Sequence, residues 1–175
     1  MASVTVSRVI DADVDDVVAA MNDVEPFVRS AGFDEVRYDG AEIRVAKDMG
    51  PMRIELTLAE ADDPDAAVVH VQREGIFEHM RTEYRVAEVD GRVEVTGETE
   101  FALDAAVVGP VLDATVIRRV RRTELNNQFD YLQERAGDGP DATSAGDGGG
   151  ADGGEGPSDG PGSGGEAAGG GDDGG

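Results

Sequence analysis

Six consecutive stretches between residues 33 and 103 alternate apolar and polar side chains, and this alternation restricts the possible folds more than any other feature. In residues 52–58, Met, Ile and Leu occupy every second position, with Arg, Glu and Thr between them. Successive side chains of a strand point to opposite faces, so the pattern predicts an antiparallel sheet with one apolar face. Asp-Gly pairs at residues 39–40 and 90–91 predict tight hairpins.

One strand and two short helices are expected before this block. Residues 4–10 are rich in β-branched side chains and favour a first strand. Apolar residues then recur at helical spacing from Val14 to Met21, behind Asp13 as a potential N-cap. A second short helix is expected directly after the first, with Pro26 in its first turn.

A long helix is expected after the last strand. Asp104 is a potential cap, Pro110 fits a first turn, and the helix is expected to run to about Ala136 before Gly137 ends it. A one-faced sheet followed by one long helix predicts an α+β domain. We expect a curved antiparallel sheet of about seven strands wrapped on the long C-terminal helix, with two short helices after the first strand.

The last 39 residues have a different composition. Residues 137–175 contain 18 of the 25 glycines and 9 of the 38 acids, and they lack aromatic, Leu, Ile, Val and basic residues. Such a segment buries too little apolar surface to offset its chain entropy. The sequence therefore predicts one domain over residues 1–136 and a disordered, acidic, Gly-rich tail over residues 137–175.

The charge balance narrows the possible partners. The net charge is -23, Lys47 is the only lysine, and Asp outnumbers Glu by 22 to 16, a composition that resembles proteins of salt-loving microbes. We expect no nucleic-acid partner, because the acidic surface repels phosphate. The chain starts without a signal-peptide pattern and contains no apolar run of membrane-spanning length, so we expect a cytoplasmic protein without stable membrane insertion.

Two segments carry a resemblance to a known superfamily. IDADVDDVVAAMNDVEPF (residues 10–27) resembles the entry into a first helix pair, and EGIFEHMRTEYRVAEVDGRVEVTGETEFAL (residues 74–103) resembles a paired-strand block before a final helix. With the order of the elements over residues 3–135, they resemble the START-like (SRPBCC) superfamily, the helix-grip fold of the birch pollen allergens and polyketide cyclases. Within it, the chain looks most like the coenzyme Q-binding and polyketide cyclase/dehydrase group. It departs from the pattern in having no Trp after the first helix.

The resemblance implies a cavity between the sheet and the long helix that often holds an apolar molecule. We therefore expect the protein to bind or carry a small hydrophobic ligand, such as an isoprenoid quinone or a lipid. The alternatives are an enzyme that resembles polyketide cyclases or dehydratases and a ligand-free protein-interaction module. The superfamily shares no catalytic residue, so the resemblance assigns none.

The expected cavity wall combines inward strand positions with one stripe of the long helix. Its residues are Met52, Ile54, Leu56, Met80, Tyr84, Val95, Phe101, Leu112, Val116, Arg118, Arg122 and Phe129.

Residues 118–122 contain four arginines and allow two interpretations. They can form a solvated face that pairs with acids such as Glu124. Alternatively, Arg118 or Arg122 reaches the cavity and binds an acidic or carbonyl head group, because Arg118 falls on the helical stripe of Phe129. For an enzyme, these two arginines, Tyr84 and Tyr131 are the candidates.

The two histidines are expected to point outward. His70 shares a strand face with Gln72 and Glu74, and His79 adjoins the inward-facing Met80. Neither lies at a recognisable metal-ligand spacing, the chain has no Cys, and no phosphate or dinucleotide fingerprint is present. We therefore expect neither a metal nor a cofactor.

Overall fold

The computed structural model of the chain describes residues 1–103 and 113–137. The elements, in chain order, are β1 (Ala2–Ile10), α1 (Val14–Asn22), α2 (Val24–Ser30), β2 (Glu35–Tyr38), β3 (Glu42–Met49), β4 (Met52–Glu60), β5 (Val68–Glu74), β6 (Phe77–Val89), β7 (Arg92–Leu103) and α3 (Ala114–Gly137). The seven strands form one antiparallel sheet in the order β1-β7-β6-β5-β4-β3-β2. The predicted α+β helix-grip architecture is confirmed.

The alternation in the sequence becomes one buried and one solvated face. In β4, Ile54, Leu56 and Leu58 are buried and the side chains between them are more exposed. The same pattern runs along β6 and β7, where Met80 and Val95 belong to the buried set. Between β6 and β7, the Asp90-Gly91 pair has φ values of 53° and 72°, the left-handed conformation that a tight hairpin turn requires.

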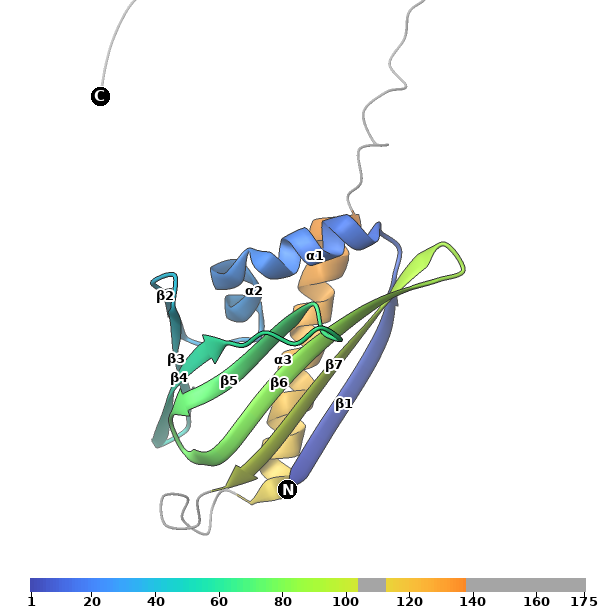
Figure 1. Cartoon of the computed structure of the whole chain (residues 1–175). Coiled ribbons are helices and arrows are strands. Elements are labelled where there is room, and N and C mark those ends of the chain that lie inside the picture. Colours follow the sequence, from blue (N-terminus) through green and yellow to red (C-terminus); the bar gives the residue numbers. More distant parts are fainter. Residues whose placement is uncertain (104–112, 138–175) are drawn as a thin grey trace, which may run out of the picture. The chain divides into compact units, whose positions relative to one another are not determined.

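Helix α3 lies along the apolar face of the curved sheet (Figure 1) and contacts β1 and β7. At Gly97 in β7, the missing side chain leaves room for the helix. A Cβ built on Gly97 would lie 2.8 Å from Leu125 Cδ2 and 3.2 Å from Phe129 Cζ. Gly97 therefore marks a close approach of two elements.

The short helices α1 and α2 pack against α3. Val17 and Phe27, one from each short helix, are fully buried. Asp13 occupies the N-cap position of α1 as predicted, although its side chain makes no capping hydrogen bond.

Helix α3 begins at Ala114, and Asp113 Oδ1 accepts hydrogen bonds from the backbone N–H groups of Thr115 and Val116 at 2.8 and 2.9 Å. The cap predicted at Asp104 and the first turn predicted around Pro110 lie outside the described residues, as does the predicted tail beyond Gly137.

Candidate functional site

Two adjoining cavities lie between the sheet and α3. The first encloses about 30 Å³ and the second about 20 Å³. One water needs about 10–15 Å³ of such space, so the first cavity has room for two or three waters and the second for one or two. Phe33, Arg121 and Glu124 line both cavities, so these three side chains form the partition between them.

The walls combine apolar and polar side chains. Leu58, Met80 and Leu125 contribute apolar surface to the first cavity, and Ile54 and Phe77 contribute it to the second. The remaining lining residues are Val28, Ala31, His70, Thr82, Tyr84, Thr99 and Gln128 in the first cavity, and Lys47, Met49, Leu56, Ile117 and Val120 in the second.

An ionic cluster joins the sheet to α3 at the partition. Glu124 accepts a hydrogen bond from Lys47 Nζ at 3.0 Å on Oε1, and its Oε2 lies 2.8 Å from Arg121 Nη1. The side chains of Lys47, Arg121 and Glu124 are 22%, 12% and 5% exposed. Lys47 also lies 5.7 Å from the ring centre of Phe33, and the Arg121 guanidinium lies 5.5 Å from that of Phe77. Both cations therefore lie in an environment with little water, where their charges are weakly screened.

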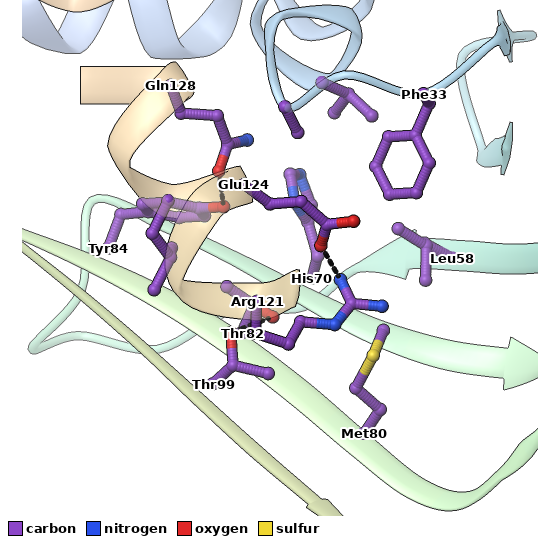
Figure 2. Close-up of a pocket in the computed structure, with 13 residues that line it drawn as sticks. Phe33, Leu58, His70, Met80, Thr82, Tyr84, Thr99, Arg121, Glu124 and Gln128 are labelled. Atoms are coloured by element: carbon purple, nitrogen blue, oxygen red, sulfur yellow. Dashed lines mark hydrogen bonds and ion pairs between the residues drawn. The ribbon is translucent and has the colours of Figure 1, made fainter. Parts of the chain in front are cut away.

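A second set of polar side chains, His70, Thr82, Tyr84, Thr99 and Gln128, also lines the first cavity (Figure 2). The Tyr84 hydroxyl donates to Gln128 Oε1 at 2.8 Å, and the Thr82 and Thr99 hydroxyls are 2.9 Å apart. His70 is buried beside them, with its ring centre 6.1 Å from that of Tyr84. These contacts satisfy the tyrosine and threonine hydroxyls, but they leave the imidazole without a described partner.

Three buried side-chain atoms facing this space lack hydrogen-bond partners among the described residues: two nitrogens, His70 Nε2 and Arg121 Nε, and one oxygen, Glu124 Oε2, whose contact with Arg121 is an ion pair without hydrogen-bond geometry. Burial lowers the pKa of His70 to about 4, so its imidazole is neutral at pH 7. Burial also raises the pKa of Tyr84, which keeps the phenol protonated. Because unsatisfied buried polar atoms are uncommon, these two nitrogens indicate groups that a water or a ligand can bind.

Two of the predicted cavity residues, Met80 and Tyr84, line the first cavity, and two others, Ile54 and Leu56, line the second. Met52 is partly buried against the core. The others fall elsewhere: Val95, Phe101 and Phe129 are buried outside both cavity linings, Val116 is 37% exposed, and Leu112 lies outside the described residues.

The predicted inward arginines are wrong. Arg118 and Arg122 are exposed, and Arg121 is the arginine that lines both cavities. The reason is a change of inward face along α3. One inward set, positions 117, 121, 124 and 128, begins near the start of the helix, and a second set, positions 125, 129, 132 and 136, continues to its end, so the two overlap between positions 124 and 129. The two sets have the same spacing, but they are offset by eight residues, or about 80° around the helix. Arg118 lies on the same helical stripe as the second set, and that stripe faces solvent near the start of the helix.

The predicted outward orientation of His70 is also wrong. His70 pairs across the sheet with Thr82, which lies on the apolar face, so the histidine shares that face. Valines precede and follow His70, and their apolar character misled the assignment of the face. His79 is exposed, as expected.

The sequence analysis missed Lys47 and Gln128 as site residues, and it placed Glu124 on the surface. The sequence does contain a signal for Lys47. It lies two and four residues after Val45 and Ile43, so it shares their strand face, and both of those residues are buried. Glu124 and Gln128 carry no such signal, since a polar residue on a helix is usually solvated.

Metal-binding clusters and membrane-spanning helices are both missing from the described part of the chain. Within residues 1–103 and 113–137, no cluster of three or more His, Asp or Glu side chains is placed to hold a metal ion. No helix in these ranges has the length and apolar character needed to cross a membrane.

Comparison with known proteins gives similarity in structure but not in sequence. No family model matches the chain, and no curated protein matches it in sequence. A Thermus thermophilus protein superimposes with a TM-score of 0.61 at 17% identity, over 77% of this chain and 97% of the other. A START superfamily protein from Mycobacterium smegmatis gives 0.56 at 12% identity, with the same two shares of 77% and 97%. The Zhui aromatase/cyclase from Streptomyces sp. R1128 gives 0.55 at 18%, over 77% and 90%.

These identities are too low to transfer a function, but the match over nearly the whole length of each neighbour establishes the architecture. The resemblance inferred from residues 10–27 and 74–103 is therefore confirmed at the level of the fold. The chain has the helix-grip fold of the START-like superfamily.

Proposed function

We propose that the protein binds and carries a small hydrophobic molecule, of the isoprenoid quinone or lipid class, in the space between the sheet and α3. The observation that carries this proposal is the pair of adjoining cavities that share three lining residues, Phe33, Arg121 and Glu124. Apolar walls with a few convergent polar groups are the usual composition of a small-molecule site.

The present cavities are smaller than such a ligand, so binding requires side chains to move. Met49 and Met80 line the two cavities, and the unbranched methionine side chain adapts its shape readily. Displacement of the partition would join the two spaces into one. We therefore expect the ligand to bind by rearranging side chains on a fixed backbone.

Two alternative functions receive less support. An imidazole with a pKa of about 4 is a weak base at neutral pH, so His70 suits a hydrogen-bonding role better than proton abstraction in a cyclase or dehydratase. A ligand-free interaction module would gain stability from an apolar interior, whereas this chain buries Glu124 and Gln128 there.

The direct test is native mass spectrometry and organic extraction of protein purified in molar salt. A discrete co-purifying apolar molecule supports the proposal, and a bare mass counts against it. Titration with the uncharged fluorescent probe N-phenyl-1-naphthylamine provides a second test. The cavity-filling change Ala31→Leu should weaken probe binding, whereas Ala87→Leu at an exposed position should leave it unchanged. Equal binding by both variants would place the probe elsewhere.

A further inference from the structure

The charge inside the site is opposite to the charge of the rest of the protein. Acids outnumber bases by 38 to 15 over the whole chain. In the walls of the two cavities, however, the charged side chains are Lys47, Arg121 and Glu124, two cations for one acid. The other titratable groups of these walls are His70 and Tyr84, which are neutral at pH 7. The interior therefore carries a net charge of +1.

A net charge in a weakly hydrated space is unfavourable unless a counter-charge accompanies it. Glu124 uses one oxygen for each cation, so neither Lys47 nor Arg121 has the acid to itself. No other acid lines the described cavity walls. The excess charge must therefore be solvated by water or balanced by a dissolved ion or a ligand.

Donors for such a counter-charge remain free at the cluster. An ammonium group has three N–H donors, and Lys47 uses one of them on Glu124. Arg121 keeps Nε without a partner among the described residues. His70 Nε2, which also lacks a described partner, lines the same first cavity as Arg121 and donates only in the tautomer that carries the proton on Nε2. Hydrogen bonds from cationic donors to an anion are about twice as strong as neutral ones.

We propose that the ligand carries an anionic head group, the carboxylate of an amphipathic acid, which Lys47 and Arg121 bind at the partition. This inference rests on the proposed function and narrows it. Of the two ligand classes named there, quinones are neutral, and the excess positive charge favours an acidic lipid. The apolar part of the acid would occupy the space lined by Leu58, Met80 and Leu125.

The test compares three probes of the same chain length by titration calorimetry at pH 7.5 in 1 M KCl. They are octanoic acid, 1-octanol and octylamine. We expect octanoate to bind about tenfold tighter than octanol, and octylamine to bind most weakly. At this salt concentration the Debye length is about 3 Å, so charges on the exposed surface contribute little.

Two variants test the role of the cluster in opposite directions. Lys47→Met removes a cation and should lower the ratio of octanoate affinity to octanol affinity about tenfold. Glu124→Gln raises the interior charge and should strengthen octanoate binding, a result that misfolding does not produce. Arg119→Met makes the same charge change as Lys47→Met at an exposed position of α3 and should leave the affinity ratio of the two probes unchanged.

Equal affinities for octanoate and octanol would overturn the inference and leave the proposed function intact. Binding of none of the three probes would overturn both. If Glu124→Gln weakened octanoate binding, Glu124 would itself contact the head group, and the assignment to Lys47 and Arg121 would be wrong.

Discussion

The change Gly97→Ala tests how closely α3 packs on the sheet. Gly97 has an ordinary strand backbone, since its φ is not among the positive ones, so alanine meets no backbone strain there. The new Cβ would lie 2.8 Å from Leu125 Cδ2, which is 0.6 Å (3.4 minus 2.8) inside the start of ordinary van der Waals contact. Phe129 is 0% exposed and lies outside both cavity linings, so its ring has little space to retreat, and Leu125, 2% exposed, can shift only into the first cavity of about 30 Å³.

Overpacking of this kind costs about 1–3 kcal/mol. Where the site tolerates a methyl group, Gly→Ala instead stabilises a protein by about 0.4–1 kcal/mol through the unfolded chain, so the sign of the effect is diagnostic. For a domain of this size the expected loss corresponds to a decrease in Tm of roughly 4–15 °C. Differential scanning calorimetry at a fixed salt concentration measures it.

A double-mutant cycle isolates the contact. Leu125→Ala alone should cost about 2–5 kcal/mol, because it leaves a cavity in the core. In the Gly97→Ala background the same change also relieves the overlap, so its cost should be smaller by about 0.5–3 kcal/mol. If Gly97→Ala leaves stability unchanged or raises it, and the two changes are additive, then α3 does not approach β7 as closely as the structure shows.

Three further outcomes are expected. Burial lowers the pKa of His70 from about 6.5 to about 4, so below pH 6.5 the unfolded chain binds a proton that the folded chain does not, and about 3 kcal/mol of stability is lost between pH 6.5 and pH 4. In urea unfolding across this range, His70→Gln should remove that loss and His79→Gln should retain it. Tyr84→Phe leaves Gln128 Oε1 without its donor and should cost about 1–3 kcal/mol, with Gln128→Leu recovering part of the loss in the double variant; full additivity would argue against the contact. Deletion of residues 138–175 should leave Tm in molar salt nearly unchanged, since that segment lacks large apolar side chains, and a drop of many degrees would show that it docks.

The sheet could be predicted from the sequence because apolar and polar side chains alternate strictly along its strands, and a shift in register would expose the apolar set. A shift of one residue would turn Ile54 and Leu56 to solvent, so the alternation fixes the faces of β4, β6 and β7. Strand β5 was predicted less well, since His70 lies between valines and either face of that strand is partly apolar. Its orientation is set by pairing with Thr82, a relation that the local sequence does not contain.

The site could be predicted only in part, because its polar residues come from a helix whose inward face changes along its length. Periodicity assigns one stripe to a helix, and the stripe of Phe129 and Leu132 is correct for the second half of α3. Extending that stripe toward the start of the helix predicts that Arg118 faces inward. In the structure, Arg121 and Glu124 line the cavity instead. The direction in which the first half of α3 faces depends on the strands beneath it, which lie some tens of residues earlier in the chain.

The buried polar residues are informative because a stable core does not require them. Apolar residues of similar volume in place of a buried ionic cluster are often neutral or stabilising by about 1–4 kcal/mol. Glu124 and Gln128 nevertheless occupy inward positions of α3, and Lys47, the only lysine of the chain, reaches Glu124 from β3. Stability alone gives no reason for this arrangement, whereas recognition of a polar head group requires fixed donors in a weakly hydrated space. Arg121 and Glu124 belong both to the ionic cluster and to the partition, so the same two side chains help to separate the cavities and contribute to the charge on which the proposed ligand chemistry rests.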